Sequence, residues 1–298
     1  MIANFYIIPQ SFKNEIMSNE NFFSSLDSFI GDYHNLVAHK EDNKIYIQED
    51  VFQIELPNGY NLGQFIYASD LELEGKEKSI RQFLSNIFLK LPRTQISIED
   101  LKSKIKNNSL ESCTGIISLF KIEDIASENQ IVYDTNSWYS FRRYHLGIFF
   151  GNVNYFIDEC IKYFPKIFFH KNNYSSTGKI LNGFASKIVS HLEALNDVLP
   201  VIMIKEKFAN HTDLLERFST IAKLDETATV EGKKKTRLKF NFENEEGKFE
   251  TLICEPHLKL STNDKGDSKY FKNRIYFHFG KSNVQDSKIL VAHIGEHL

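Results

Sequence analysis

Histidines are concentrated at the carboxyl end of the chain. Four of the ten histidines lie in the last 45 residues, at His257, His278, His293 and His297. Histidine is the side chain whose ordinary pKa lies closest to neutral pH, and it therefore serves as acid or base in many enzymes. The cluster predicts a site at which protons are transferred.

Charged and phenolic side chains accompany these histidines, in a combination that suits cleavage of RNA without a metal ion. Such cleavage needs a base for the 2′-hydroxyl, a cation for the phosphate and an acid for the leaving oxygen. Lys259 or His257 would be the base, Arg274 the phosphate ligand, and Tyr276, His278 or a later histidine the acid. The candidate catalytic residues are Glu255, His257, Lys259, Arg274, Tyr276, His278, His293 and His297.

These residues lie in segments with the alternating pattern of half-buried β-strands, at 253–260, 274–279 and 289–298. Because side chains alternate between the two faces of a strand, Glu255, His257 and Lys259 should share one face, and so should Arg274, Tyr276 and His278. The same alternation places His293 and His297 on the same face of their strand as Ile289 and Val291. A polar face exposed to solvent is the alternative interpretation of this pattern.

A basic stretch precedes the histidine-rich strands. Residues 233–239 hold five cations, which would attract phosphates although the whole chain carries a net charge of −3. The alternative is a strand edge that its lysines keep soluble. The candidate nucleic-acid-binding residues are Lys233, Lys234, Lys235, Arg237 and Lys239.

Motifs for nucleotide and metal chemistry are absent from the sequence. It has no phosphate-binding glycine loop, no dinucleotide fingerprint, no nucleophile elbow and no zinc-protease helix motif. A metal-dependent nuclease of the restriction type needs an acidic residue one position before its lysine, whereas Glu255 lies four positions before Lys259. His293 and His297 lie on a strand without thiolate ligands, which argues against a zinc site. Neither a metal nor another cofactor is expected.

The predicted elements indicate an α+β protein. A mixed N-terminal region (residues 1–148) includes a hairpin over residues 35–48 and a helix over 79–91. Helices over 152–164, 179–198 and 212–223 follow, and then a four-stranded antiparallel sheet made of residues 237–243, 249–260, 274–279 and 288–298. The second domain is expected to span residues 149–298.

The composition is that of an ordinary globular protein. Of the 298 residues 42% are hydrophobic and 13% aromatic, which is enough for a buried core. No apolar run is long enough for a membrane span, and the first residues do not resemble a secretion signal. The three cysteines are odd in number and widely spaced, which argues against a disulfide framework. A cytoplasmic protein with no membrane partner is expected.

The carboxyl-terminal strands resemble those of the RelE/HigB/ParE toxin superfamily. The resemblance rests on His257-x-Lys259, on residues 273–279 around Arg274, and on residues 289–297, which end in His297. It covers residues from about 211 to 298 and implies a ribosome-associated RNA endonuclease with roles for Lys259, Arg274 and a carboxyl-terminal His or Tyr. This chain departs from the family in its long N-terminal part and in Pro256, which interrupts a strand.

Three functions follow from these observations. The first is a metal-independent endoribonuclease, a toxin-like effector of bacterial antiviral defence or stress response. The second is a non-catalytic module that binds RNA or another nucleic acid, or a protein partner such as an antitoxin. The third is a structural subunit of a defence complex. The sequence leaves open whether the chain is an enzyme and whether its ligand is RNA, DNA or a smaller molecule.

Overall fold

The computed structural model describes residues 3–12, 19–38, 43–56, 59–68, 73, 75–108, 112–123, 125–232, 235–269 and 272–298. The chain forms two compact units, Met1–Arg142 and Arg143–Leu298, called unit 1 and unit 2 here. The division falls within a helix, α5 (Thr135–Ile148), whereas the sequence placed it after residue 148. Among the described residues, no helix has both the length and the apolar composition that crossing a membrane requires.

Unit 1 is built on a five-stranded parallel sheet with the strand order β3-β2-β1-β4-β5. Its strands are β1 (Ala3–Ile7), β2 (Asn43–Gln48), β3 (Arg93–Thr94), β4 (Cys113–Ile117) and β5 (Ile131–Val132). Its helices are α1 (Asn19–Ala38), α2 (Leu62–Tyr67), α3 (Gly75–Phe88), α4 (Ile98–Lys106) and the first part of α5. The hairpin expected over residues 35–48 is wrong, because α1 continues to Ala38 and β2 pairs in parallel with β1.

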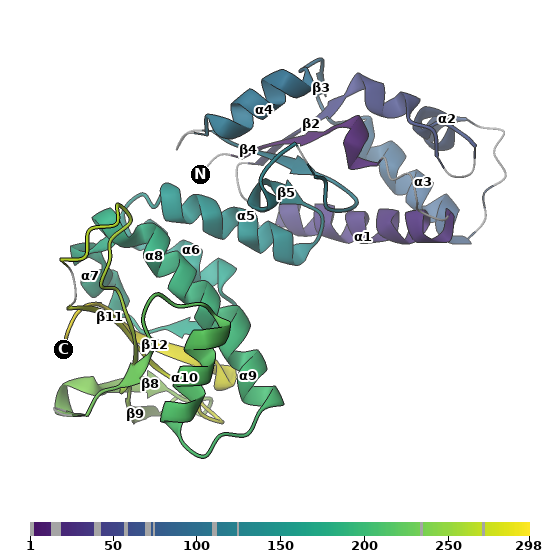
Figure 1. Cartoon of the computed structure of the whole chain (residues 1–298). Coiled ribbons are helices and arrows are strands. Elements are labelled where there is room, and N and C mark those ends of the chain that lie inside the picture. Colours follow the sequence, from purple (N-terminus) through teal and green to yellow (C-terminus); the bar gives the residue numbers. More distant parts are fainter. Residues whose placement is uncertain are drawn as a thin grey trace. The chain divides into compact units, whose positions relative to one another are not determined.

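Alternating side chains of β1 explain why both faces of this sheet are covered (Figure 1). Tyr6 packs in a cluster with Leu101 and Ile105 of α4, which lie one helical turn apart and face the sheet. Phe5 points to the other face and contacts Trp138 and Phe141 of α5, with ring centroids 5.9 and 4.8 Å away. The sheet is therefore buried between helices, as is usual for parallel sheets.

Unit 2 contains a mixed five-stranded sheet with the order β6-β12-β11-β10-β7 and a separate hairpin of β8 and β9. The strands are β6 (Ile167–Phe169), β7 (Thr229–Val230), β8 (Lys239–Glu243), β9 (Phe249–Ile253), β10 (Pro256–Lys259), β11 (Asn273–His278) and β12 (Ile289–Glu296). The helices are α6 (Val153–Tyr163), α7 (Asn173–Ser176), α8 (Leu181–Glu193), which continues as a π-helical turn (Ala194–Val198), α9 (Leu199–Lys205) and α10 (His211–Ile221). The chain is thus a mixed α/β protein.

The predicted four-stranded antiparallel sheet is wrong in its membership. β10, β11 and β12 are antiparallel neighbours, but β6 joins β12 in parallel and β7 occupies the other edge. The first two expected strands form their own hairpin, whose Phe242 packs against Leu290 and Ala292 of β12. Pro256 lacks a backbone N–H and begins β10, so that the expected strand over residues 249–260 is divided into β9 and β10.

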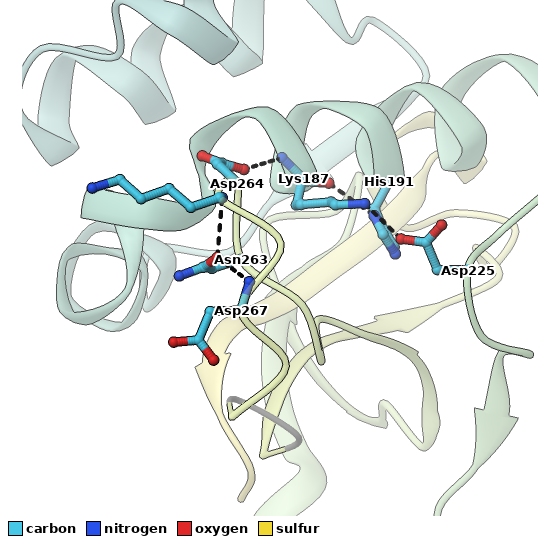
Figure 2. Close-up of polar contacts among 7 residues, drawn as sticks. Lys187, His191, Asp225, Asn263, Asp264 and Asp267 are labelled. Atoms are coloured by element: carbon cyan, nitrogen blue, oxygen red, sulfur yellow. Dashed lines mark hydrogen bonds and ion pairs between the residues drawn. The ribbon is translucent and has the colours of Figure 1, made fainter.

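A loop between β10 and β11 caps α8 where its regular turns begin, after the non-helical backbone of Asn182 and Gly183 (Figure 2). The Asp264 carboxylate accepts hydrogen bonds from the backbone N–H groups of Ser186 and Lys187, at 3.2 and 2.9 Å. Asn263 Oδ1 accepts from the N–H groups of Lys265 and Asp267 and shapes this loop. Asp264 therefore acts as a helix cap supplied from a distant part of the chain.

His191 of α8 is also held by structural contacts (Figure 2). Its Nδ1 donates to the Lys187 carbonyl, 2.8 Å away, and the Lys187 ammonium pairs with Asp225 at 2.6 Å. Burial lowers the pKa of His191 despite these partners. His191 also hydrogen-bonds to the backbone of Lys259 in β10, which links α8 to the sheet.

The turn between β11 and β12 has an unusual backbone. Gln285, Asp286 and Ser287 have φ angles of 50°, 55° and 57°, so that three consecutive non-glycine residues are left-handed. L-amino acids rarely adopt this conformation in succession. Gly280, with φ of 101°, lies against this turn, and a Cβ at its position would come within 2.5 Å of the Ser287 carbonyl oxygen.

Candidate functional site

A row of polar side chains crosses the sheet of unit 2 from β7 to β12. In the strand register His257 lies opposite Thr229 of β7 and Tyr276 of β11, and Tyr276 lies opposite His293 of β12. Asn172, which precedes α7, extends the row beyond β12. We call Thr229, His257, Tyr276, His293 and Asn172 the polar row.

The sequence predicted correctly which side of the sheet the polar side chains of β10 and β11 occupy, but it placed His293 of β12 on the wrong side. Leu258, Ile275 and Phe277 point into the helix-covered core, so His257 and Tyr276 point away from it. Strict alternation would place His293 with Val291, but a β-bulge shifts the register so that Tyr276 faces His293 and Phe277 faces Val291. The extra residue brings His293 onto the face of Tyr276.

Both nitrogens of His257 are hydrogen-bonded within the protein. Its Nδ1 lies 3.2 Å from the carbonyl oxygen of Glu255, which can only accept, so Nδ1 carries the proton. Its Nε2 then accepts from the Thr229 hydroxyl at 3.0 Å. Burial lowers the pKa of His257, and the charges of Arg274 and Lys259 lower it further. His257 is therefore a neutral link between β7 and β10.

His293 is held in the same manner. Its Nε2 donates to the Glu296 carbonyl at 2.9 Å, and its Nδ1 accepts from the Asn172 amide at 3.1 Å. Burial is the main cause that lowers the pKa of His293. A catalytic role for either imidazole would require one of these bonds to break.

Tyr276 stands between the two histidines and is fully buried. Its ring centroid lies 5.1 Å from that of His257 and 6.1 Å from that of His293. Burial raises the pKa of Tyr276, whereas the backbone of Leu298 lowers it. The phenol is therefore protonated at neutral pH, so that in proton transfer it could serve as an acid and not as a base.

More exposed charges lie at the border of the row. His297 packs edge-on against Tyr276, with centroids 6.2 Å apart, and its Nε2 lies 3.1 Å from the Glu231 carboxylate. Lys259 lies 3.7 Å from Glu226. Arg274 stands opposite Lys259 in the register and donates to the Asn273 carbonyl at 2.8 Å. We call His297, Glu231, Lys259, Glu226 and Arg274 the charged border.

Glu255 and His278, two further predicted catalytic residues, make other contacts. The backbone carbonyl of Glu255 accepts from His257 and from the N–H of Glu231, at 3.1 Å. His278 faces Leu290 beyond the bulge, and its Nδ1 accepts from the Gly280 N–H. Burial lowers the pKa of His278.

The predicted basic stretch is only partly described. Lys233 and Lys234 lie outside the described residues, as does the side chain of Lys235. Arg237 belongs to a 3-10 turn (Lys235–Leu238) instead of the predicted strand, and both Arg237 and Lys239 are exposed. Lys239 begins β8 and borders a cavity, which the sequence did not predict.

This cavity of about 710 Å³ lies between the end of β6 and the hairpin, and we call it the aromatic groove. Phe168, Phe240 and Phe249 line it, together with Lys171 and Lys239. Phe249 is 71% exposed and Phe240 is half-buried, so that aromatic surface is open to solvent at the groove. Stacking surfaces and cations thus lie together on one side of unit 2.

Two polar side chains hold the groove in shape. The His170 ring packs edge-on against Phe240 and Phe242, with centroids 5.4 and 5.3 Å away, and hydrogen-bonds to the backbone of Asn241. Gln285 Nε2 donates to the Glu243 carbonyl at 2.9 Å. The edge of β8 that does not face β9 is therefore tied to β6 and to the left-handed turn.

Sequence reasoning missed Glu226, Glu231, Asn172 and the groove. β7 has two residues and β6 has three, too few for a recognisable strand pattern, and their partners are distant in the sequence. The alternation of Lys239, Phe240, Asn241 and Phe242 does predict a half-buried strand. It carries no information on which surface that strand meets.

Among the described residues, no three His, Cys, Asp or Glu side chains come together as a metal site would require. No protein family model matches the chain. No curated protein and no solved structure matches it significantly either. The resemblance to the RelE/HigB/ParE toxins stays a prediction.

Proposed function

We propose that unit 2 binds single-stranded nucleic acid in the aromatic groove. The observation that carries the proposal is the exposed Phe249 beside Phe240, Lys171 and Lys239 in one cavity. Proteins that hold single strands combine aromatic rings, on which bases stack, with cations that follow the phosphates. The exposed Phe249 would supply such a stacking surface, and Lys171 and Lys239, which outnumber the carboxylate of Glu243 in the lining, would contact the phosphates.

The basic stretch supports the same proposal. It leads directly into β8, and the exposed Arg237 lies two residues before Lys239 at the groove. A strand of nucleic acid bound at Lys239 would find a further cation in Arg237. Binding should therefore weaken as salt increases, because each phosphate contact releases counterions.

Metal-independent RNA cleavage is the second candidate function, and the charged border favours it. His297 pairs with Glu231 next to Tyr276, and its side chain is 41% exposed. His257 and His293, in contrast, are buried, and both nitrogens of each ring are hydrogen-bonded within the protein. An imidazole paired with a carboxylate can take or supply a proton. His297 would be the base or acid and Arg274 the phosphate ligand, in agreement with the family resemblance.

Binding can be measured by fluorescence anisotropy with short labelled single-stranded RNA and DNA at several salt concentrations. Phe249→Ala should weaken binding about tenfold, because stacking contributes about 1–3 kcal/mol per base. Lys239→Ala should make the slope of log K against log salt concentration shallower by about one, because one phosphate contact is lost. RNA bound more tightly than DNA would identify the natural ligand.

Matched controls lie on the same hairpin. Ile253 and Lys248 are exposed and do not line the groove, so Ile253→Ala and Lys248→Ala should leave affinity unchanged. If all four variants bind equally, the groove is not the site. The same samples, incubated in EDTA and separated on a gel, test cleavage: products that disappear in His297→Ala support the second candidate.

A further inference from the structure

The hairpin of β8 and β9 includes a strand that has a neighbour on one side only. β9 pairs with β8 in a separate two-stranded sheet, and no other described strand joins it. None of its residues is fully buried, and Phe249, Thr251 and Ile253 are exposed. β9 is therefore an edge strand that presents two large apolar side chains to solvent.

The register of the hairpin shows which backbone groups of β9 face outward. Leu238 lies opposite Cys254 and Asn244 lies opposite Lys248, and a backbone hydrogen bond joins each of these two pairs. Hydrogen-bonded and non-hydrogen-bonded pairs alternate along antiparallel strands. The even-numbered residues therefore bond within the hairpin, whereas the N–H and C=O groups of the odd-numbered residues point away from it.

The outward groups of β8 and β9 differ in their partners. On β8, His170 hydrogen-bonds to the backbone of Asn241, and Gln285 donates to the carbonyl of Glu243. On β9, no described backbone group pairs with the outward N–H and C=O groups. A strand from another molecule can pair with such an edge through its main chain.

β9 lacks the devices that usually prevent an edge strand from pairing. Lysine, proline and β-bulges serve this purpose in natural sheets. The strand contains no lysine and no proline, and its register with β8 is regular. Its one charged side chain, Glu250, lies on the face opposite to Phe249 and pairs with Lys281.

We propose that two copies of this chain associate through β9, antiparallel about a twofold axis at Thr251. In this register Phe249 lies opposite Ile253 of the second copy, and Glu250 lies opposite Leu252. Aromatic and β-branched side chains form favourable cross-strand pairs. An axis at Glu250 would set two carboxylates opposite each other, and an axis at Leu252 would leave Phe249 without a partner in β9. The strand is thus complementary to itself in one register, which favours a second copy as the partner.

This association joins two hairpins into a four-stranded sheet and leaves both aromatic grooves open. All of β8 lines the groove, but Phe249 is the one residue of β9 in the lining. A short nucleic-acid strand that fills one groove does not require the second copy. A pairing of two short strands buries less than the roughly 1,200–2,000 Å² of stable complexes, so the dimer should dissociate on dilution.

Sedimentation equilibrium of the full chain, from about 1 µM to 1 mM, tests the proposal. The mass should rise with concentration from that of one chain toward that of two. Thr251→Lys should abolish this rise, because two ammonium groups would lie opposite each other at the axis. Asn241→Lys is the matched control, since it removes the same Thr251–Asn241 side-chain hydrogen bond but places its lysine on β8. It should associate as the unchanged chain does.

A cross-link tests the register. The three native cysteines are buried, and Thr251→Cys should form a disulfide-linked dimer under mild oxidation, whereas Asn241→Cys should not. Facing Cα atoms in a hydrogen-bonded pair are about 5.5 Å apart, within the range of a disulfide. Urea denaturation verifies that each variant is folded. A single-chain mass at every concentration, a dimer that Thr251→Lys leaves intact, equal loss in Asn241→Lys, or no disulfide in Thr251→Cys would each overturn the proposal.

Discussion

The two buried imidazoles of the polar row act as links between strands. His257 joins β7 to β10, and His293 joins the end of β12 to Asn172. A protonated ring could not accept the bond from Thr229 or from Asn172, so both links need the neutral form. The clustering of histidines near the carboxyl end is therefore explained in part by the packing of the sheet.

Gly295 allows His293 to take this position. A Cβ at residue 295 would lie 2.9 Å from His293 Nε2 and 3.1 Å from the Ser176 carbonyl oxygen. Gly295→Ala should therefore lower the free energy of unfolding by about 1–3 kcal/mol, the usual cost of overpacking. Urea denaturation followed by circular dichroism measures this change.

A glycine in open space provides the control for this variant. A Cβ at Gly232 would meet no atom of the described residues within 4 Å, so Gly232→Ala should change stability by less than about 0.5 kcal/mol. Equal stability of the two variants would show that the ring of His293 moves away without cost.

At the residue scale, the sequence predicted contacts within neighbouring strands and missed contacts between distant segments. The common face of His257 and Tyr276 follows from strand alternation alone. The bulge in β12 has no sequence signal, and the position of His293 was consequently wrong. Thr229, Asn172 and Glu231 could not be predicted, because nothing local indicates which strands they approach.

The hairpin and the left-handed turn are the elements that shape the aromatic groove. Gln285 of the turn bonds to β8, while Asp286 and Ser287 keep the backbone in a conformation that favours glycine. Backbone strain of this kind persists only where the surrounding structure imposes it, and it is frequent at binding sites.

Two substitutions at this turn should have opposite effects. Ser287→Gly should raise the free energy of unfolding by roughly 1 kcal/mol, because glycine adopts a positive φ without a steric penalty. Gly280→Ala should lower it by about 1–3 kcal/mol, because its Cβ would meet the Ser287 and Lys288 carbonyl oxygens. Thermal and urea unfolding report both changes.

Ser268 is the matched control for the glycine substitution. It is exposed in the loop between β10 and β11, and its φ is not positive. Ser268→Gly should therefore leave stability unchanged or slightly lower. A gain equal to that of Ser287→Gly would mean that the left-handed backbone is not strained.

Elements with strong periodicity were predicted well, and very short ones were not. The expected helices over residues 152–164 and 212–223 correspond to α6 and α10. Their apolar residues recur at helical spacing, and α6 begins at the Asn152 cap and ends before Pro165. The order of strands in the sheet depends on β6 and β7, which are too short to have a pattern.

At the scale of the whole molecule, burial of histidines makes the stability of unit 2 depend on pH. Burial lowers the pKa of five histidines in this unit, which are His170, His191, His257, His278 and His293. The unfolded chain therefore binds protons at a higher pH than the folded unit does, beginning near pH 6.5.

Stability of unit 2 should accordingly be complete above about pH 7.5 and fall as the pH drops below about 6.5. The loss proceeds at up to about 1.4 kcal/mol per pH unit for each additional proton that the unfolded state holds. Urea midpoints from circular dichroism, measured at several pH values, should show this decrease.

Trp138 allows unit 1 to be followed separately, since it is buried there and is the single tryptophan of the chain. The urea midpoint measured by its fluorescence should not decrease on acidification in the way that the histidines of unit 2 cause for that unit. A circular dichroism midpoint that stays constant or rises on acidification would contradict the assignment of these histidines as neutral links.

The position of β12 in the sheet has a consequence for synthesis of the protein. This strand lies between β6 and β11, yet it follows both in the chain. As the chain leaves the ribosome, unit 1 can fold early, while the sheet of unit 2 lacks an inner strand until residues 289–296 emerge. Prematurely terminated products would expose unpaired strand edges, which makes them prone to aggregate and to recruit chaperones.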